Sequence, residues 1–167
     1  MMREHAFDVE TIPASTPTGT GDDSLEDEMA SPLTRWYDAL AAGDLARAAE
    51  NLTEDTVLHV PGRSTNTGTY TGRDAVLAFV GHAAEVTGGT LQLTVHRVLD
   101  DGEWGVALAT YTATRPDRDR PLENNLAHVA RLRDGRIAES WLHSRDQYAV
   151  DEFWGEPAPA TAQPVAG

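Results

Sequence analysis

Apolar residues in the first part of the chain recur every three or four positions, as they do along one face of a helix. The pattern predicts three helices, which begin near residues 32, 45 and 73. Ser31 with Pro32, and then Asp44, are typical of helix starts, and Gly43 separates the first two helices. The apolar face of the first helix comprises Leu33, Trp36, Tyr37, Leu40 and Ala41.

The second half of the chain alternates apolar and polar residues with the period of two that is typical of strands. Turn sequences such as Asp101-Gly102 and Asp134-Gly135 separate strands that we expect at about residues 90–99, 103–114, 122–133 and 136–145. A short strand at 56–60 and a Gly/Thr-rich loop at 63–71 precede the third helix. This order indicates the α+β class. We expect a cone-shaped roll, in which a curved antiparallel sheet wraps around three N-terminal helices and leaves an internal cavity.

The formal net charge of −14 is concentrated at the N-terminus. Residues 1–30 carry one Arg and eight carboxylates, for a charge of −7, and show no apolar period. We therefore expect an acidic flexible leader at 1–30, one domain at 31–154 and a disordered tail at 155–167. A second hypothesis for the leader is that Phe7 and Ile12 cross a dimer partner or the mouth of the cavity.

Composition excludes several classes of function. The chain has no cysteine, so disulfides and thiolate chemistry are excluded. The domain has no cluster of basic residues, which argues against nucleic acid as a partner. No stretch approaches the roughly 20 apolar residues of a membrane span, and the N-terminus lacks the apolar segment of a signal peptide. We therefore expect no membrane association and a cytoplasmic location.

Polar and aromatic residues share strand faces that we expect to line the cavity. Asn124 and His128 alternate with leucine and alanine on one face, and Trp141 and His143 share the parity of Ile137. Imidazole takes and gives a proton near neutral pH, so histidines on such a face indicate a ligand or proton-transfer site, although each could be a satisfied core residue. The candidates are Trp36, Tyr37, His59, Tyr111, Asn124, His128, Trp141 and His143.

Other kinds of site receive less support. His59, His128 and His143 could in principle hold a metal ion, but no His-Glu-x-x-His spacing or neighbouring carboxylate ligand accompanies them. The chain also lacks a Gly-x-Ser-x-Gly elbow and a glycine-rich phosphate loop. We therefore expect neither a metal nor a cofactor.

Three segments, AAGDLARAAENLTEDTVLHVPG, GTYTGRDAVLAFV and RLRDGRIAESWLHSRDQYAVDEFW, resemble the nuclear transport factor 2-like superfamily. Within it, the chain is most similar to SnoaL-like and ketosteroid-isomerase-like proteins, and the resemblance covers about residues 31–154. It implies the cup-shaped fold described above and a homodimer. Relatives include steroid isomerases, polyketide cyclases, epoxide hydrolases, dehydratases and proteins that only bind, so the fold alone does not name the reaction.

The resemblance also implies roles for individual residues. The acid/base carboxylate of the isomerases falls on His59, the tyrosine of their oxyanion hole falls on Trp36, and its partner aspartate falls within one residue of His128. Because all three positions carry other residue types, we expect chemistry that differs from steroid isomerisation. The acid/base aspartate of the polyketide cyclases corresponds most nearly to Asp146, which could instead cap a short helix at about 147–154.

These observations predict a cyclase or isomerase of secondary, polyketide-like metabolism that acts on a hydrophobic substrate. His59 would act as base, and His128 with Asn124 or Trp36 would donate hydrogen bonds to a developing enolate oxygen. One alternative is a protein that binds a hydrophobic small molecule without chemistry. Another is a dimer-forming interaction module whose cavity is filled by its own side chains. We expect dimerisation through an outer sheet face, which could be the one that carries Trp104 or the one that carries Arg131 and Arg133.

Overall fold

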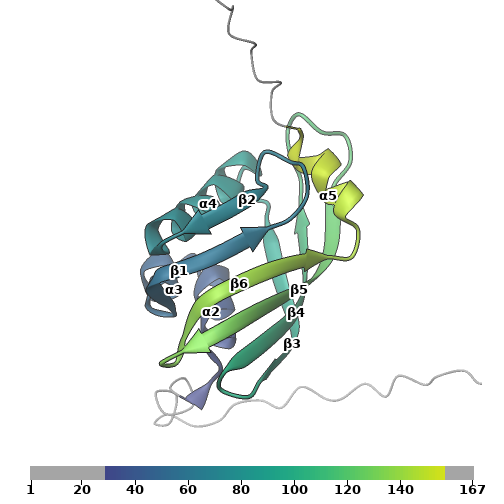
Figure 1. Cartoon of the computed structure of the whole chain (residues 1–167). Coiled ribbons are helices and arrows are strands. Elements are labelled where there is room, and N and C mark those ends of the chain that lie inside the picture. Colours follow the sequence, from purple (N-terminus) through teal and green to yellow (C-terminus); the bar gives the residue numbers. More distant parts are fainter. Residues whose placement is uncertain (1–28, 157–167) are drawn as a thin grey trace, which may run out of the picture.

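The computed structural model describes residues 29–156. The expectations for the leader and the tail, including those for Phe7 and Ile12, therefore lie almost entirely outside the described residues. Figure 1 shows a curved sheet with helices along one side and a short helix at one end. No helix within residues 29–156 is long and apolar enough to cross a membrane.

The elements follow the predicted order closely. The helices are α2 (Pro32–Ala41), α3 (Leu45–Glu50), α4 (Arg73–Val86) and α5 (Gln147–Trp154). The strands are β1 (Leu52–Val60), β2 (Gly68–Thr71), β3 (Gln92–Asp100), β4 (Trp104–Ala113), β5 (Leu122–Arg133) and β6 (Arg136–Ser144). Two details differ from the prediction, because β1 begins at Leu52 and β2 forms within the segment predicted as a loop.

The six strands form one sheet in the order β2-β1-β6-β5-β4-β3. β1 and β6 run parallel, whereas all other neighbouring strands are antiparallel. The predicted α+β roll is confirmed, with the correction that its sheet is mixed rather than purely antiparallel. A parallel pair needs a long crossover, and the chain here passes through β2, α4 and three further strands between β1 and β6.

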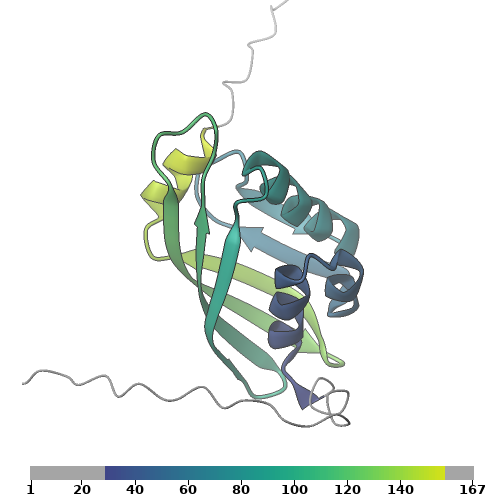
Figure 2. The same ribbon diagram turned by 180° about the vertical axis from the view of Figure 1, so that it is seen from behind.

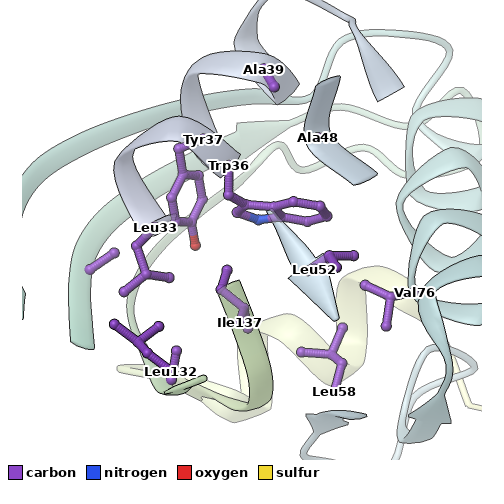
Figure 3. Close-up of a cluster of buried hydrophobic side chains, with 12 residues drawn as sticks. Leu33, Trp36, Tyr37, Ala39, Ala48, Leu52, Leu58, Val76, Leu132 and Ile137 are labelled. Atoms are coloured by element: carbon purple, nitrogen blue, oxygen red, sulfur yellow. The ribbon is translucent and has the colours of Figure 1, made fainter. Parts of the chain in front are cut away.

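Helices α2 and α4 pack against the concave face of the sheet (Figure 2). Ser31 is the N-cap of α2, and its hydroxyl accepts a hydrogen bond from the backbone N–H of Leu33 at 3.3 Å. Leu33, Trp36 and Tyr37 are all buried on the inner face of this helix, near Ile137 of β6 (Figure 3). Burial of a large apolar side chain contributes about 1.5–3 kcal/mol, so this face anchors α2 to the sheet.

A local irregularity in β6 decides which of its side chains face inward. β5 and β6 are joined by a tight turn at Asp134-Gly135, where φ is positive at both residues (53° and 68°), as a type I′ turn requires. β6 then carries a bulge at 138–139, where the register with β5 shifts. Because the bulge reverses the alternation, Ile137 and Ser140 both face inward and Trp141 faces outward.

The convex face of the sheet leaves large apolar side chains exposed. Leu99, Trp104 and Leu108 are 57%, 42% and 43% exposed, respectively. A row of paired residues crosses five strands on this face, namely His59, Trp141, Val129, Val106 and Leu99. The convex face therefore carries apolar side chains that a neighbouring surface could cover.

Candidate functional site

A cavity of about 140 Å³ lies between the concave face of the sheet and helices α2, α4 and α5. Its wall is largely apolar and includes Trp36, Leu58, Phe79 and Leu142. Its polar lining comes from tyrosine, histidine, serine, threonine, asparagine and glutamine, and no carboxylate, Lys or Arg of the described chain lines it. An apolar cavity of about 150 Å³ is large enough for a single ring such as benzene. The site therefore suits an uncharged, apolar ligand.

His128 is the most deeply placed ionisable group of this cavity. It lies on the inward face of β5, where strand alternation predicted it, and is 4% exposed. Its Nδ1 lies 3.0 Å from the hydroxyl oxygen of Tyr37 on α2. The two rings meet edge to face, with centroids 5.7 Å apart and planes at 84°. Helix α2 and strand β5 thus hold the imidazole in a fixed orientation.

Burial determines the charge of this pair. It lowers the pKa of His128 from 6.5 to about 4, because the surroundings offer the imidazolium ion no counter-charge. Burial likewise raises the pKa of Tyr37. Both side chains are therefore neutral at pH 7, and the pair acts through hydrogen bonds rather than through a formal charge.

The hydrogen-bond inventory favours one tautomer of His128. Its Nε2 has no hydrogen-bond partner among the described residues. If the Tyr37 hydroxyl donates to Nδ1, Nε2 carries the proton, and it is the only group of the pair without a partner. The opposite tautomer would leave both the Tyr37 proton and Nε2 unpaired. Since each buried unpaired group costs about 1–3 kcal/mol, we assign the proton to Nε2.

A second set of polar groups lies further along β5, toward α5. Asn124 is buried, and its amide nitrogen donates to the Ser144 hydroxyl at 3.0 Å, whereas its carbonyl oxygen has no partner among the described residues. The neighbouring Tyr111 hydroxyl accepts a hydrogen bond from the Trp154 indole at 3.3 Å. Burial raises the pKa of Tyr111, so this hydroxyl is also neutral. Ser144, Tyr111 and Trp154 line the cavity directly.

His59 does not face the cavity, which corrects the prediction for this residue. Thr56, Leu58 and Val60 of β1 face inward, so the alternation turns His59 to the convex face. There its Nε2 lies 2.9 Å from a carboxylate oxygen of Glu139. Its ring also stacks on Trp141, with centroids 5.4 Å apart. The proposed base is therefore outside the cavity.

Trp141 and His143 are likewise on the convex face, contrary to the prediction. Both were placed inward from the parity of Ile137, but the bulge at 138–139 reverses that parity. Asp146 is exposed, and its side chain accepts a hydrogen bond from the backbone N–H of Ala149 at 3.0 Å. It is thus the N-cap of α5, as the alternative interpretation held.

The structure therefore brings together four of the predicted site residues, Trp36, Tyr37, Tyr111 and His128, with Asn124 beside them. The three histidines considered for a metal do not converge, and residues 29–156 contain no group of three or more His, Cys, Asp or Glu that could hold a metal ion. The sequence interpretation missed Ser140, Ser144 and Trp154. The bulge turns the two serines inward, against the regular alternation expected from the sequence. Trp154 could have been found, because the apolar spacing of Val150, Phe153 and Trp154 indicates a buried helix face.

With this geometry established, comparison with known proteins identifies the family. The family model described as the SnoaL-like domain matches residues 33–140. This chain is a SnoaL-like protein. The match covers α2 through most of β6, and thus nearly all of the cavity wall apart from α5.

Individual proteins are similar to this chain in sequence and structure. The SnoaL-like chain is 29% identical to the uncharacterized protein Rv0034 of Mycobacterium tuberculosis, over 73% of this chain and 92% of that protein. It is 32% identical to Bal32a, from a soil-derived mobile gene cassette, whose structure matches with a TM-score of 0.70 over 74% of this chain and 94% of that one. IdmH of Streptomyces antibioticus, a proposed polyketide cyclase, is 24% identical, with a TM-score of 0.57 over 68% of this chain and 89% of IdmH. The fold is therefore that of nuclear transport factor 2-like and ketosteroid-isomerase-like proteins.

Proposed function

We propose that this protein catalyses the cyclisation or isomerisation of a hydrophobic carbonyl compound inside its cavity. The observation that carries the proposal is His128, a buried and neutral imidazole that lines the cavity and whose Nε2 has no hydrogen-bond partner within residues 29–156. A ligand with a carbonyl oxygen at this atom would supply the missing hydrogen bond. The apolar wall would bury the remainder of the ligand.

His128 would act as a hydrogen-bond donor to the oxygen on which negative charge develops. A fixed donor in a dry cavity stabilises such charge more strongly than water does, because it needs no reorganisation during the reaction. Tyr37 would be the positioning residue, since its bond to Nδ1 fixes both the tautomer and the direction of the ring. The carbonyl oxygen of Asn124, which lies beside the cavity and has no partner among the described residues, would accept a hydrogen bond from a ligand hydroxyl.

Ring closure within one molecule fits this cavity better than proton abstraction does. The described lining holds no carboxylate to serve as a base, and His59 and Asp146 lie outside it. An intramolecular closure that only shifts electron pairs within the substrate gains or loses no atom and requires no base. Its barrier can be lowered by orientation and by polarisation of a carbonyl group. The proposed polyketide cyclase activity of the structural relative IdmH supports this choice.

A protein that binds such a molecule without changing it is the second candidate. It is favoured by the same absence of a carboxylate from the described lining. Substitution of His128 distinguishes the two functions. A binding protein needs only affinity for its ligand at this position. A cyclase needs a stronger interaction with the transition state than with the substrate.

The test pairs thermal shift and calorimetry on a panel of neutral ketones (cyclohexenone, tetralone and progesterone) with turnover of linear triene ketones, followed by mass spectrometry. We expect a ketone to raise the melting temperature and a cyclised product of unchanged mass to form. His128→Gln should lower kcat by about 10²-fold or more, as loss of one oxyanion donor does in other enzymes. Binding without turnover would support the second candidate, and no binding of any ketone would contradict both.

We also propose that the protein pairs with a second copy through the convex face of its sheet. The exposed Leu99, Trp104 and Leu108 support this arrangement, and the family resemblance predicts a homodimer. Light scattering should give twice the mass of the chain, and Leu108→Glu should shift the mass toward that of a monomer while His82→Glu, at an exposed position on α4, should not. A monomeric wild-type protein at micromolar concentration would contradict the proposal.

A further inference from the structure

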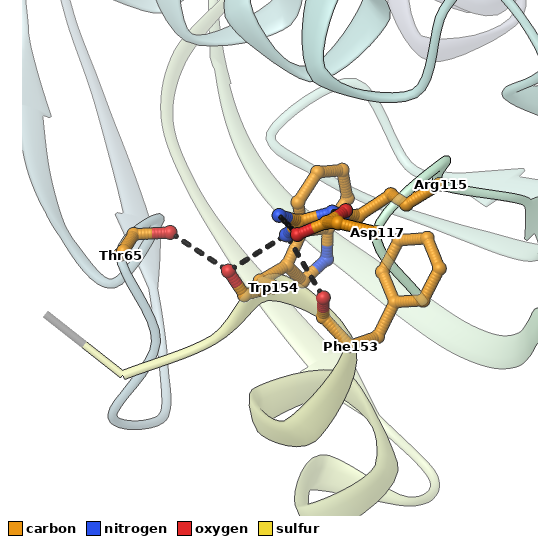
Figure 4. Close-up of polar contacts among 5 residues, drawn as sticks. All are labelled: Thr65, Arg115, Asp117, Phe153 and Trp154. Carbon is orange, nitrogen blue, oxygen red and sulfur yellow. Dashed lines mark hydrogen bonds and ion pairs between the residues drawn. The ribbon is translucent and has the colours of Figure 1, made fainter. Parts of the chain in front are cut away.

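Helix α5 closes one end of the cavity and is held there by residues far away in the sequence. The guanidinium of Arg115, which follows β4, donates from one nitrogen to the backbone carbonyls of Phe153 and Trp154, at 2.9 Å each. Its other nitrogens donate to both carboxylate oxygens of Asp117, at 2.9 and 2.7 Å (Figure 4). Arg115 thus connects the β4–β5 loop, to which it belongs, to the end of α5.

The contact of Arg115 with the last carbonyls of α5 compensates for the lack of a basic residue in the last turn of this helix. The last four carbonyls of any helix lack partners within the helix, and a cation near them is favourable. α5 has no basic residue in its own last turn, so Arg115 supplies that cation from outside the helix. The Arg115 side chain is only 14% exposed, and its guanidinium carbon lies 5.9 Å from the centre of the Phe153 ring. The Arg115 side chain is therefore mostly shielded from water, whereas Asp117 is exposed.

The loop between β1 and β2 also binds the Trp154 carbonyl. The hydroxyl of Thr65, in the loop between β1 and β2, donates to the Trp154 carbonyl at 3.1 Å, and the backbone N–H of Thr65 donates to the Gly155 carbonyl at 2.8 Å. Figure 4 shows Thr65 and Arg115 approaching the Trp154 carbonyl from different segments. Two separate loops therefore fix the backbone at the position of Trp154.

The side chain of Trp154 continues this arrangement into the cavity. Trp154 is 7% exposed and lines the cavity at its α5 end, and its indole N–H donates to the Tyr111 hydroxyl at 3.3 Å. The Phe153 ring stands at 89° to the indole, with centroids 5.2 Å apart. The indole thus has a fixed position in the cavity wall.

We propose that Trp154 is a specificity-determining residue that limits the length of the ligand, and that Arg115 is the positioning residue that keeps it in place. The inference rests on the proposed function, since it assumes that the ligand occupies this cavity. It predicts that the wild-type protein prefers a one-ring ketone to a four-ring ketone. It also predicts that loss of the indole reverses or weakens this preference, because the cavity then extends toward the surface beneath α5.

The experiment measures the dissociation constants of cyclohexenone and progesterone for each variant and compares their ratio. Trp154→Ala should shift the ratio toward progesterone by at least about tenfold, the scale on which pockets discriminate small changes in size. Trp154→Phe, which keeps an aromatic ring but loses the bond to Tyr111, should shift it less. Arg115→Gln should shift the ratio in the same direction, and Arg115→Lys should restore part of the wild-type preference.

A matched control separates positioning from stability. Arg133→Gln removes an arginine that pairs with Asp55 on the surface, away from the cavity. It should leave the ratio unchanged. An unchanged ratio in Trp154→Ala, with cyclohexenone still bound, would overturn the length limit and leave the proposed function intact. If Arg115→Gln and Arg133→Gln leave the ratio equally unchanged, Arg115 has only a structural role. If no variant binds either ketone, the proposed function and this inference fail together.

Discussion

Acidification should destabilise this protein through the protonation of His128. The side chain is 4% exposed, and burial lowers its pKa from 6.5 to about 4. Between these two pH values, the unfolded chain binds more protons on this group than the folded chain does. The stability that the neutral imidazole provides is therefore fully present above pH 6.5 and is lost as the pH falls through that range.

The size of this loss in unfolding free energy follows from the pKa difference of His128 between the folded and unfolded states. Each unit of pKa difference corresponds to about 1.4 kcal/mol, so the full effect of His128 is about 3 kcal/mol, and about 2 kcal/mol of it falls between pH 7 and pH 5. Carboxylates also titrate on acidification, so the wild-type slope alone does not isolate His128. The variant His128→Gln removes the titration and keeps a polar side chain that can bond to Tyr37.

Urea denaturation at pH 7, 6 and 5 provides the test. The difference in unfolding free energy between wild type and His128→Gln should shrink by about 2 kcal/mol from pH 7 to pH 5. The same measurement on His82→Gln, at an exposed position on α4, is the control for the loss of a histidine. Parallel pH dependences of wild type and His128→Gln would refute the reasoning, since they would mean that the imidazole titrates alike in the folded and unfolded states.

Three further predictions concern neighbouring residues. Tyr37→Phe should cost about 1–3 kcal/mol in urea denaturation, because it leaves Nδ1 of His128 buried and unpaired; a cost near zero would mean that the bond contributes nothing net. Asp146→Ala should lower stability by about 0.5–2 kcal/mol through loss of the α5 N-cap, as thermal melts would show, and Asp146→Asn should retain most of it. His59→Gln should leave ketone affinity within about twofold of wild type by calorimetry, because the side chain lies on the convex face, and a large loss would return His59 to the ligand site.

Much of the fold could be predicted because its local signals are strong. Ser31-Pro32 and Asp44 mark helix starts that the structure retains as caps, and Asp134-Gly135 forms the expected turn. The parallel pairing of β1 with β6 could not be predicted in this way, because it joins segments that are distant in the sequence. The apolar pattern within a strand does not indicate which other strand it pairs with.

The candidate site was predicted where a strand is regular and missed where it is not. His128 and Asn124 lie in β5, which alternates without interruption from Leu122 to Arg133. Trp141 was misplaced because the bulge in β6 inserts one residue that the sequence pattern does not reveal. His59 was misplaced for a different reason. Its role came from the family resemblance, whereas the alternation of Thr56, Leu58 and Val60 turns its side chain to the convex face.

The central claim is that His128 presents a free N–H to a neutral ligand in the cavity, and nitrogen-15 NMR of the histidine side chains tests it most directly. Spectra of the labelled protein at pH 7 should show His128 neutral with its proton on Nε2, and His128→Gln identifies the signal. Addition of the ketone that most raises the melting temperature should shift Nε2 and leave Nδ1, which remains bonded to Tyr37, nearly unchanged. A proton on Nδ1, or an Nε2 signal that does not respond to a ketone shown to bind, would contradict the account.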